Sequence, residues 1–192
     1  MILAILMNNQ IMRYGGATEL SVYGVAATIA SLFQALFCGV GQAVQPLVSA
    51  NFGAGKTERI RSVLRMSMLT VLVMGVLFTA LGELLPVQIT RLFTAATPEV
   101  IAAAPTIYRL YFLLFPPLGV TVLATYYLQS VMQDRRSMLI AVLRSAVVSG
   151  ALLLLLPLML DINGVWLAMP LSELLVAALA LFFLYGRRAR QA

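Results

Sequence analysis

Three ionisable side chains interrupt the long apolar segments of this 192-residue chain: Arg109, Arg144 and Glu173. A charged side chain at the centre of a bilayer costs about 2.5–3.5 kcal/mol, so such residues usually face other protein or a water-filled cavity. At about 1.5 Å per helical residue, Glu173 lies roughly 13 Å from the predicted start of its helix at Gly164, near the membrane midplane. Arg109 lies roughly 15 Å from Glu99 by the same measure. The matching depths predict that Arg109 and Glu173 can pair.

Two roles remain open for Glu173. It is either a carboxylate that handles protons or cations, or the neutralised partner of Arg109. The variant Glu173→Gln separates them: loss of transport with normal folding supports the first role, and poor insertion or folding supports the second. Arg144 lies about 10 Å from the cytoplasmic end of its predicted helix, and its long side chain can extend to the interface instead.

A stripe of small and polar residues follows one face of the first apolar segment, because its members recur at alternating steps of three and four. The members are Ser21, Gly24, Thr28, Ser31, Ala35, Cys38, Gln42 and Gln45. Lipid tails cannot hydrogen-bond, so this face must meet protein or a water-filled cavity. Close helix packing is one explanation for the small residues from Gly24 to Cys38. Gln42 and Gln45 are bulkier and more polar, and they are candidates for a substrate or cation cavity.

Three prolines are candidate hinges: Pro46 in the first apolar segment, and Pro116 and Pro117 in the third. Proline removes a backbone donor and leaves a carbonyl that another group must satisfy. Broken helices near mid-membrane are common at transporter binding sites and hinges. A static kink that accommodates neighbouring helices is the other interpretation.

The third apolar segment also has the densest aromatic content. The aromatic residues are Tyr108, Tyr111, Phe112, Phe115, Tyr126 and Tyr127. Some of them can line a pocket for flat, cationic, apolar compounds through cation–π contacts. Tyr126 and Tyr127 equally fit an aromatic belt at the membrane interface.

The helices that must position these residues are predicted from composition and length. The chain is 61% apolar and 10% charged, whereas a soluble domain is about 45–50% apolar and about 25% charged. A helix needs about 20 mostly apolar residues to cross a bilayer, and five segments qualify. They cover approximately 20–44, 63–85, 101–132, 138–160 and 164–185. The prediction is an all-α integral membrane protein, a polytopic helix bundle that forms one transmembrane domain over 1–192.

The apolar run over residues 1–7 is too short to cross a membrane, and no basic region or cleavage site marks it as a signal peptide. We therefore expect five complete transmembrane helices plus a partial N-terminal one, in a polypeptide that is a fragment of a longer protein.

Local signals predict how the segments are joined. The stretch 86–98 alternates apolar and polar residues, which suits a short amphipathic segment at the outer interface. Thr97, Pro98 and Glu99 form a helix start, with a hydroxyl cap, proline at the first helical position and an acid in the first turn. The stretch 161–164 (DING) predicts a tight turn between two antiparallel helices.

Basic residues predict the orientation in the membrane. Nine of them occupy alternate connections on one side: Lys56, Arg59, Arg61, Arg65, Arg135, Arg136, Arg187, Arg188 and Arg190. The other connections hold only Arg13 and Arg91. The protein is thus expected to be a multi-pass protein of the cell membrane with a cytoplasmic C-terminus.

Other classes of protein are excluded. The sequence has no histidine and one cysteine, Cys38, which excludes imidazole chemistry, an internal disulfide and multi-cysteine metal clusters. No nucleophile–base pair is present, so we expect no enzyme and no bound metal or cofactor. The net charge of +6 is not gathered on one solvated face, so we expect no nucleic-acid partner.

The stretch 39–56 (GVGQAVQPLVSANFGAGK) resembles the eighth helix and following loop of multidrug and toxic compound extrusion (MATE) transporters. The stretches 14–16 (YGG), 23–26 (YGVA) and 164–173 (GVWLAMPLSE) look like the C-terminal lobe of the same family. The similarity covers about 8–186. Gln42, Gln45, Pro46, Asn51 and Gly53 match positions of the family motif.

The resemblance implies an antiporter of two six-helix lobes that exports organic cations and drugs against inward H⁺ or Na⁺. This chain then corresponds to the C-terminal lobe, from the end of helix seven to helix twelve, and its partners are the lipid bilayer and an N-terminal lobe. The family's coupling acids cannot be transferred, because the third segment has no acid between Glu99 and Asp134.

Two alternatives remain. A flippase for lipid-linked precursors, from the same broader superfamily, should have a cationic cavity for phosphate. Only Arg109 and Arg144 are cations inside the predicted membrane segments. The other alternative is a truncated fragment that transports nothing.

Overall fold

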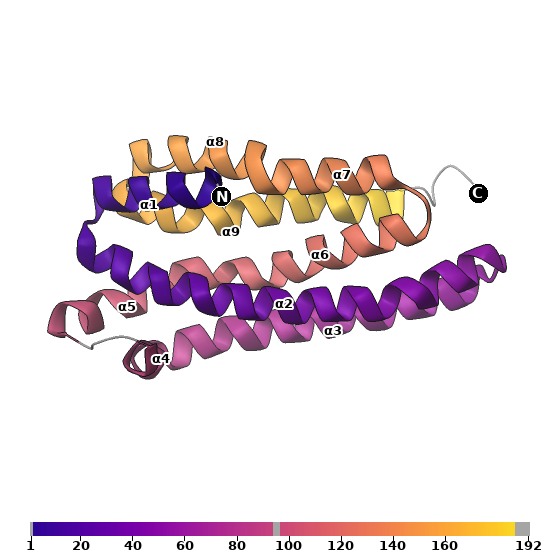
Figure 1. The fold of residues 1–192 in the computed structure, drawn as a ribbon, viewed down its shortest axis with the longest axis horizontal. Coiled ribbons are helices and arrows are strands. Elements are labelled where there is room, and N and C mark those ends of the chain that lie inside the picture. The colour runs from indigo at the N-terminus through magenta and orange to yellow at the C-terminus, as the bar shows by residue number, and fades with distance from the viewer. Residues whose placement is uncertain (1, 94–96, 187–192) are drawn as a thin grey trace.

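The computed structural model describes residues 2–93 and 97–186, and the described part is helical throughout apart from short connections (Figure 1). The elements are α1 Ile2–Tyr14, α2 Ala17–Gly53, α3 Thr57–Leu84, α4 Pro86–Phe93, α5 Pro98–Tyr111, the 3₁₀ segment η1 Phe112–Leu114, α6 Phe115–Ser130, α7 Asp134–Val142, the π-helical segment η2 Leu143–Val147, α8 Val148–Leu155 and α9 Pro157–Tyr185. No strand occurs among these residues, as the all-α prediction requires.

Five helices are long and apolar enough to cross a membrane. They are Ala17–Gly53, Thr57–Leu84, Pro98–Ser130, Asp134–Leu155 and Pro157–Tyr185. Each overlaps one of the five predicted segments, so the predicted polytopic membrane bundle is confirmed.

The first of these helices extends beyond its predicted end. We expected the span to end near Val44, but α2 continues through Pro46 to Gly53. A proline inside a membrane helix is tolerated when neighbouring groups satisfy the backbone. Pro46 therefore lies within a continuous helix.

The chain reverses at the predicted turn over 161–164. Asp161 has φ 50° and ψ −136°, which are not helical values, although residues on both sides are helical. A Cβ on Gly164 would lie 2.4 Å from the carbonyl oxygen of Leu156. Only glycine allows the two antiparallel segments to approach this closely.

Two further local predictions are also confirmed. Thr97 caps α5, because its hydroxyl accepts a hydrogen bond from the Val100 backbone nitrogen at 3.4 Å, and Pro98 occupies the first helical position. The amphipathic stretch after α3 is the helix α4, which Figure 1 shows end-on and thus running across the long helices.

Figure 1 shows α7, α8 and α9 along one side of the molecule and α2 and α3 along the other, with α6 between them. Helix α6 packs against α2, α3, α7 and α9, and it belongs to the most buried of the five spans. The helix α1 lies against α8 and α9, where Met7 and Ile11 are buried. The helix α1 is therefore an integral part of the bundle.

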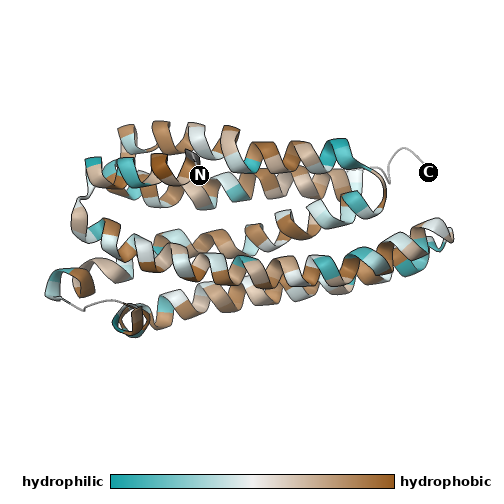
Figure 2. Cartoon of the chain, viewed as in Figure 1, coloured by the Kyte–Doolittle hydropathy of each residue, from teal (hydrophilic) through white to brown (hydrophobic). Residues whose placement is uncertain are grey.

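The outer surface is apolar. Large side chains such as Met66, Leu69 and Leu77 on α3 are exposed, and Figure 2 shows hydrophobic residues along most of the helical length. Lipid is the solvent that such a surface requires, since a water-soluble helix bundle presents a polar face.

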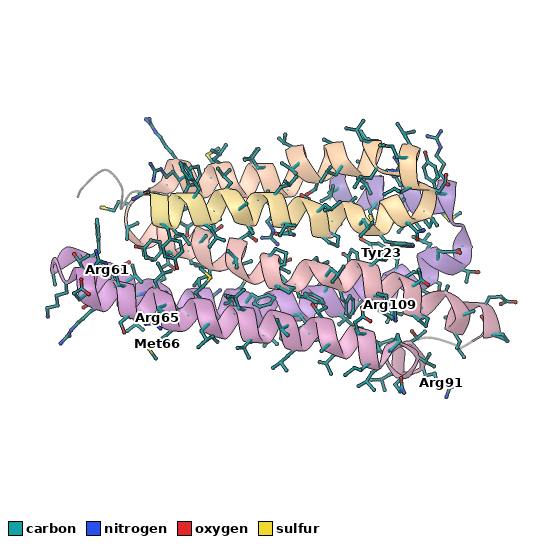
Figure 3. All side chains as sticks on the ribbon, turned by 180° about the vertical axis from the view of Figure 1, so that it is seen from behind. Tyr23, Arg61, Arg65, Met66, Arg91 and Arg109 are labelled. Atoms are coloured by element: carbon teal, nitrogen blue, oxygen red, sulfur yellow. The ribbon has the colours of Figure 1, made fainter. Side chains whose placement is uncertain are left out.

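Successive connections lie at opposite ends of the bundle. The connections around 54–56 and 131–133, together with the end of α9, lie at one end, and the turns at 15–16 and 161–164, together with the helix α4, lie at the other (Figure 1). Figure 3 shows Arg61 and Arg65 at one end and Arg91 at the other. Of the basic residues used to predict orientation, Arg187, Arg188 and Arg190 lie outside the described residues.

Candidate functional site

A cavity of about 840 Å³ opens between α1, α2, α6, α9 and the π-helical segment. Its polar lining comprises Tyr23, Ser31, Gln34, Tyr111, Thr125, Tyr126, Gln129, Arg144, Ser145 and Glu173. The rest is mostly small or apolar, including Met7 and Met169. Figure 3 shows Tyr23 between α9 and the α5–α6 helix. A volume of this order suits a drug-sized ligand, since ligand pockets measure about 300–1,000 Å³.

The central feature of the cavity wall is an ion pair. The Nε atom of Arg144 donates to Oε1 of Glu173 at 2.5 Å, and the other carboxylate oxygen accepts from the Thr121 hydroxyl at 2.9 Å. A second guanidinium nitrogen of Arg144 donates to the Gln34 side-chain oxygen at 3.3 Å. The Glu173 side chain is 5% exposed and that of Arg144 is 23% exposed. A buried carboxylate needs such partners because hydrocarbon cannot solvate its charge.

The backbone around Arg144 departs from the α-helix. The segment Leu143–Val147 is a π-helix, and the Ser149 hydroxyl donates to the carbonyl oxygen of Arg144. The Ser149 and Ser172 hydroxyls lie 2.7 Å apart, which joins this segment to α9 beside Glu173. Insertions of this kind in α-helices frequently mark functional sites.

The predicted pair between Arg109 and Glu173 is wrong. Arg109 instead donates to Glu83 at 3.1 Å, with side-chain exposures of 68% and 34%. Glu83 lies in the last turn of α3, so Arg109 is level with the end of that helix. The predicted depth of Arg109 is counted from Glu99. The Pro98–Ser130 helix, however, begins beyond the end of α3, so Arg109 lies less deep than the count from Glu99 suggests. The alternative in which Arg144 extends to the interface is also wrong, because its guanidinium binds Glu173.

Of the four predicted cavity residues, only Glu173 lines the cavity. Gln42 is exposed, and its Nε2 atom lies 3.5 Å from the Tyr126 hydroxyl. Gln45 is half-buried on the same helix, outside the cavity wall.

Within the predicted stripe, Ser31 and Cys38 do line the cavity, and a Cβ on Gly24 would meet no described atom within 4 Å. Close packing against another of the described helices therefore does not explain Gly24.

The predicted hinge prolines differ in their surroundings. Pro116 and Pro117 lie in the first turn of α6, which begins at Phe115 directly after η1. Proline at 116 cannot donate to the Phe112 carbonyl, and the Thr79 hydroxyl on α3 donates to that oxygen at 2.8 Å. Thr79 is thus the group that satisfies the carbonyl left free by the proline. Pro46 is exposed within α2. Motion at any of the three remains a prediction.

The motif residues Asn51 and Gly53 lie at the end of α2. The Asn51 side-chain nitrogen donates to the Leu47 carbonyl at 2.8 Å, and the Asn51 carbonyl accepts from the Lys56 backbone at 2.9 Å. A Cβ on Gly53 would meet no atom within 4 Å. The contacts of Asn51 shape the connection to α3 and lie outside the cavity.

Three site residues were not predicted in their observed roles: Gln34, Thr121 and Arg144. Gln34 interrupts an apolar run in the first span, and that signal could have identified it.

Of the predicted aromatic residues, Tyr111 and Tyr126 line the cavity, while Tyr108, Phe112 and Phe115 are buried in the core. Among the described residues, no group of three or more His, Cys, Asp or Glu could hold a metal ion.

A second, smaller cavity of about 360 Å³ adjoins the first and shares Thr125, Gln129 and Ala141 with it. It extends to Asp134 and Arg135 at the start of α7. Polar groups therefore continue from the neighbourhood of Glu173 to that end of the bundle.

Comparison with known proteins gives consistent matches. The sequence model of the MatE family matches residues 1–155. The multidrug export protein MepA of Staphylococcus haemolyticus (strain JCSC1435) is 23% identical over 175 residues, which is 91% of this chain and 38% of that protein.

Two solved structures have the same fold over nearly the whole chain. One is the outward-facing conformation of a multidrug resistance MATE family transporter of the MOP superfamily, with a TM-score of 0.86 and 18% identity over 98% of this chain and 42% of that one. The other is the MATE multidrug transporter DinF-BH, with a TM-score of 0.81 and 27% identity over 97% of this chain and 42% of that one. The chain thus spans about two fifths of the length of these relatives.

Proposed function

The chain belongs to the MatE family, and from that premise we propose that it is the C-terminal lobe of a transporter that exports organic cations and drugs in exchange for H⁺ or Na⁺. The match to a multidrug export protein and to multidrug transporters of known structure supports this assignment. We propose transport by alternating access, in which two lobes rock around a central cavity, and no enzymatic reaction.

The observation that carries the proposal is the cavity with a buried carboxylate in its wall. Glu173 lies within the fifth span, and it is the one acidic group among the residues that line the larger cavity. A carboxylate in such a site can bind a cation or a proton, but not both at once. If the organic cation and the coupling ion bind Glu173 in turn, export of the organic cation is linked to entry of the coupling ion.

The adjoining cavity offers a route for the coupling ion. Thr121 bonds to Glu173, the Thr125 hydroxyl donates to the Thr121 carbonyl at 2.8 Å, and the Ser137 hydroxyl donates to the Thr125 carbonyl at 3.3 Å. We propose that H⁺ or Na⁺ moves between Glu173 and the α6–α7 connection along these groups.

The orientation and partners follow from the same premise. We propose that Lys56, Arg135 and the end of α9 lie on the cytoplasmic side of the cell membrane, because basic connections are enriched on that side. The exposed polar stripe of α2, where a Cβ on Gly24 would meet no described atom within 4 Å, would face an N-terminal lobe across the central cavity. The apolar outer surface contacts lipid.

The cavity favours an exporter of cations over a flippase. A flippase for lipid-linked precursors needs net positive charge to hold phosphate, but Arg144 is neutralised by Glu173. Arg109 does not line the cavity and binds Glu83. Among the described residues, the cavity wall therefore lacks the phosphate-binding charge that the flippase requires.

Efflux of ethidium or a fluoroquinolone from cells tests the proposal. Cells should express this chain with and without an N-terminal lobe of a MATE relative, and export above the vector control is expected when both lobes are present. Absence of efflux under both conditions, with the chain present in the membrane, would remove the transporter assignment and support the non-transporting alternative.

A further inference from the structure

The ion pair in the cavity is asymmetric. Glu173 is fixed, because the Thr121 hydroxyl bonds one carboxylate oxygen at 2.9 Å and its side chain is 5% exposed. Arg144 is less confined: its side chain is 23% exposed and already has a second acceptor in Gln34 at 3.3 Å. Arg144 donates to Glu173 through one guanidinium nitrogen, Nε, rather than in the bidentate geometry that holds arginine most firmly.

The cavity has no spare negative charge while this pair is intact. Its wall contains one acidic and one basic side chain, Glu173 and Arg144. A monocation that entered would be a buried charge without a partner, and such a charge is unfavourable unless it is paired. Binding of a cation deep in the cavity therefore requires that Glu173 exchange partners.

The surroundings suit a flat, apolar cation. Tyr23, Tyr111 and Tyr126 present aromatic rings to the cavity, and Met7 and Met169 add flexible apolar contacts. Aromatic faces attract desolvated cations, and methionine adapts to ligands of different shape. These groups would replace the water that a cation loses on entry.

We infer that Arg144 is the resident counter-ion of the substrate site: it occupies Glu173 when the cavity is empty and is displaced toward Gln34 when an organic cation binds Glu173. This inference rests on the proposed function and identifies the group that competes with the substrate. Arg144 then keeps one hydrogen-bond acceptor in either state, since it already donates to Gln34 on α2 at 3.3 Å. Removal of Arg144 should therefore strengthen cation binding, the opposite of what loss of an ordinary structural residue would do.

Ethidium binding to the purified full chain in detergent tests this inference. Arg144→Gln should bind ethidium about tenfold more tightly than the wild type, and Glu173→Gln about tenfold more weakly. The double variant should match Glu173→Gln, because Arg144 acts only through the carboxylate. Arg109→Gln and Glu83→Gln are matched controls, since they make the same changes in an ion pair outside the cavity. Their affinities should stay at the wild-type value.

Specific outcomes overturn the inference. Weaker or unchanged ethidium binding by Arg144→Gln would show that Arg144 does not compete with the cation. If cells export ethidium normally with Glu173→Gln, the inference fails together with the proposed exchange at Glu173, while the assignment of the chain to a drug exporter stands. If neither export nor wild-type binding occurs, the proposed function fails and the inference with it.

A second measurement covers the case in which Arg144→Gln folds poorly. Arg144→Ala leaves space where the guanidinium lay, and ethylguanidinium at millimolar concentration should refill it as a free cation. We expect added ethylguanidinium to raise the Tm of Arg144→Ala, but not that of the wild type or of Arg144→Ala combined with Glu173→Gln. An unchanged Tm for Arg144→Ala would contradict a cation site at Glu173.

Discussion

At the scale of single residues, the chemistry of this protein centres on one buried carboxylate. Glu173 binds Arg144 from the π-helical segment and Thr121 from α6, so three separate elements meet at one charge. Desolvation of both ions offsets much of their attraction, so a buried ion pair does not by itself stabilise a fold. Its presence in a cavity wall is better explained by function.

Substitutions in this pair should show that its stabilising effect is small. Removing one partner leaves an uncompensated charge, so Arg144→Met should lower the free energy of unfolding by about 3 kcal/mol. The combined change Arg144→Met and Glu173→Leu should return it to within about 1 kcal/mol of the wild type, since two apolar side chains need no partner. Unfolding in detergent by added denaturing surfactant measures both.

The exposed pair Arg109–Glu83 provides the control for these variants. Arg109→Met should change the free energy of unfolding by only about 0–1 kcal/mol, as is usual for solvated pairs. A double variant at 144 and 173 that is as unstable as the worse single variant would contradict this view of the buried pair.

At the scale of elements, close approach between α3 and the start of α6 positions the cavity wall. A Cβ on Gly75 would lie 2.6 Å from the Pro116 Cα atom, and the Thr79 hydroxyl one turn later binds the Phe112 carbonyl. Backbone atoms cannot move aside as a flexible side chain can. The break before Pro116 is thus held by α3 on one side, while α6 carries Thr121 and Thr125 toward the cavity.

Substitution of Gly75 tests this packing. Gly75→Ala should lower the free energy of unfolding by about 1–3 kcal/mol, because the new methyl group forces α3 away from Pro116. Gly39→Ala is the matched control: its Cβ would meet nothing within 4 Å, so the change should stabilise α2 by about 0.5–1 kcal/mol. Equal effects of the two substitutions would show that α3 and α6 are not in close contact.

The helices could be predicted from the sequence because each depends on local properties. Hydropathy and length identified five spans, and the Thr97 cap and the turn at Asp161 depend on residues adjacent in the chain. The pairing of Arg144 with Glu173 could not be predicted, because depth along each helix can only be counted from an assumed boundary. The π-helical segment Leu143–Val147, which presents Arg144, has no composition that sets it apart from an α-helix.

At the scale of the whole molecule, the bundle is an apolar exterior around a polar cavity. Exposed residues such as Met66 and Leu69 form the outside, while Glu173 and Arg144 lie inside. The MatE relatives are more than twice as long as this chain, which covers 38% of one and 42% of others. We propose that the exposed side of α2 is the surface at which a second lobe would complete the cavity.

Accessibility of introduced cysteines tests the proposed orientation. Cys38 is the only cysteine, so Cys38→Ser provides a background without thiols. In intact cells a membrane-impermeant maleimide should label Asn163→Cys, whereas Lys56→Cys and Arg135→Cys should react only after the cells are opened. All three positions are exposed. The reverse pattern would place the C-terminus outside the cell.

The most direct test of the account is ethidium efflux by cells that express the chain together with an N-terminal lobe, compared between Glu173→Gln and Glu83→Gln. Both substitutions remove one carboxylate, but only Glu173 lies in the cavity wall. We expect Glu83→Gln to export ethidium at the wild-type rate and Glu173→Gln to fall to the level of the empty vector, with equal amounts of folded protein in the membrane. Export by Glu173→Gln at the wild-type rate would show that transport does not depend on this cavity.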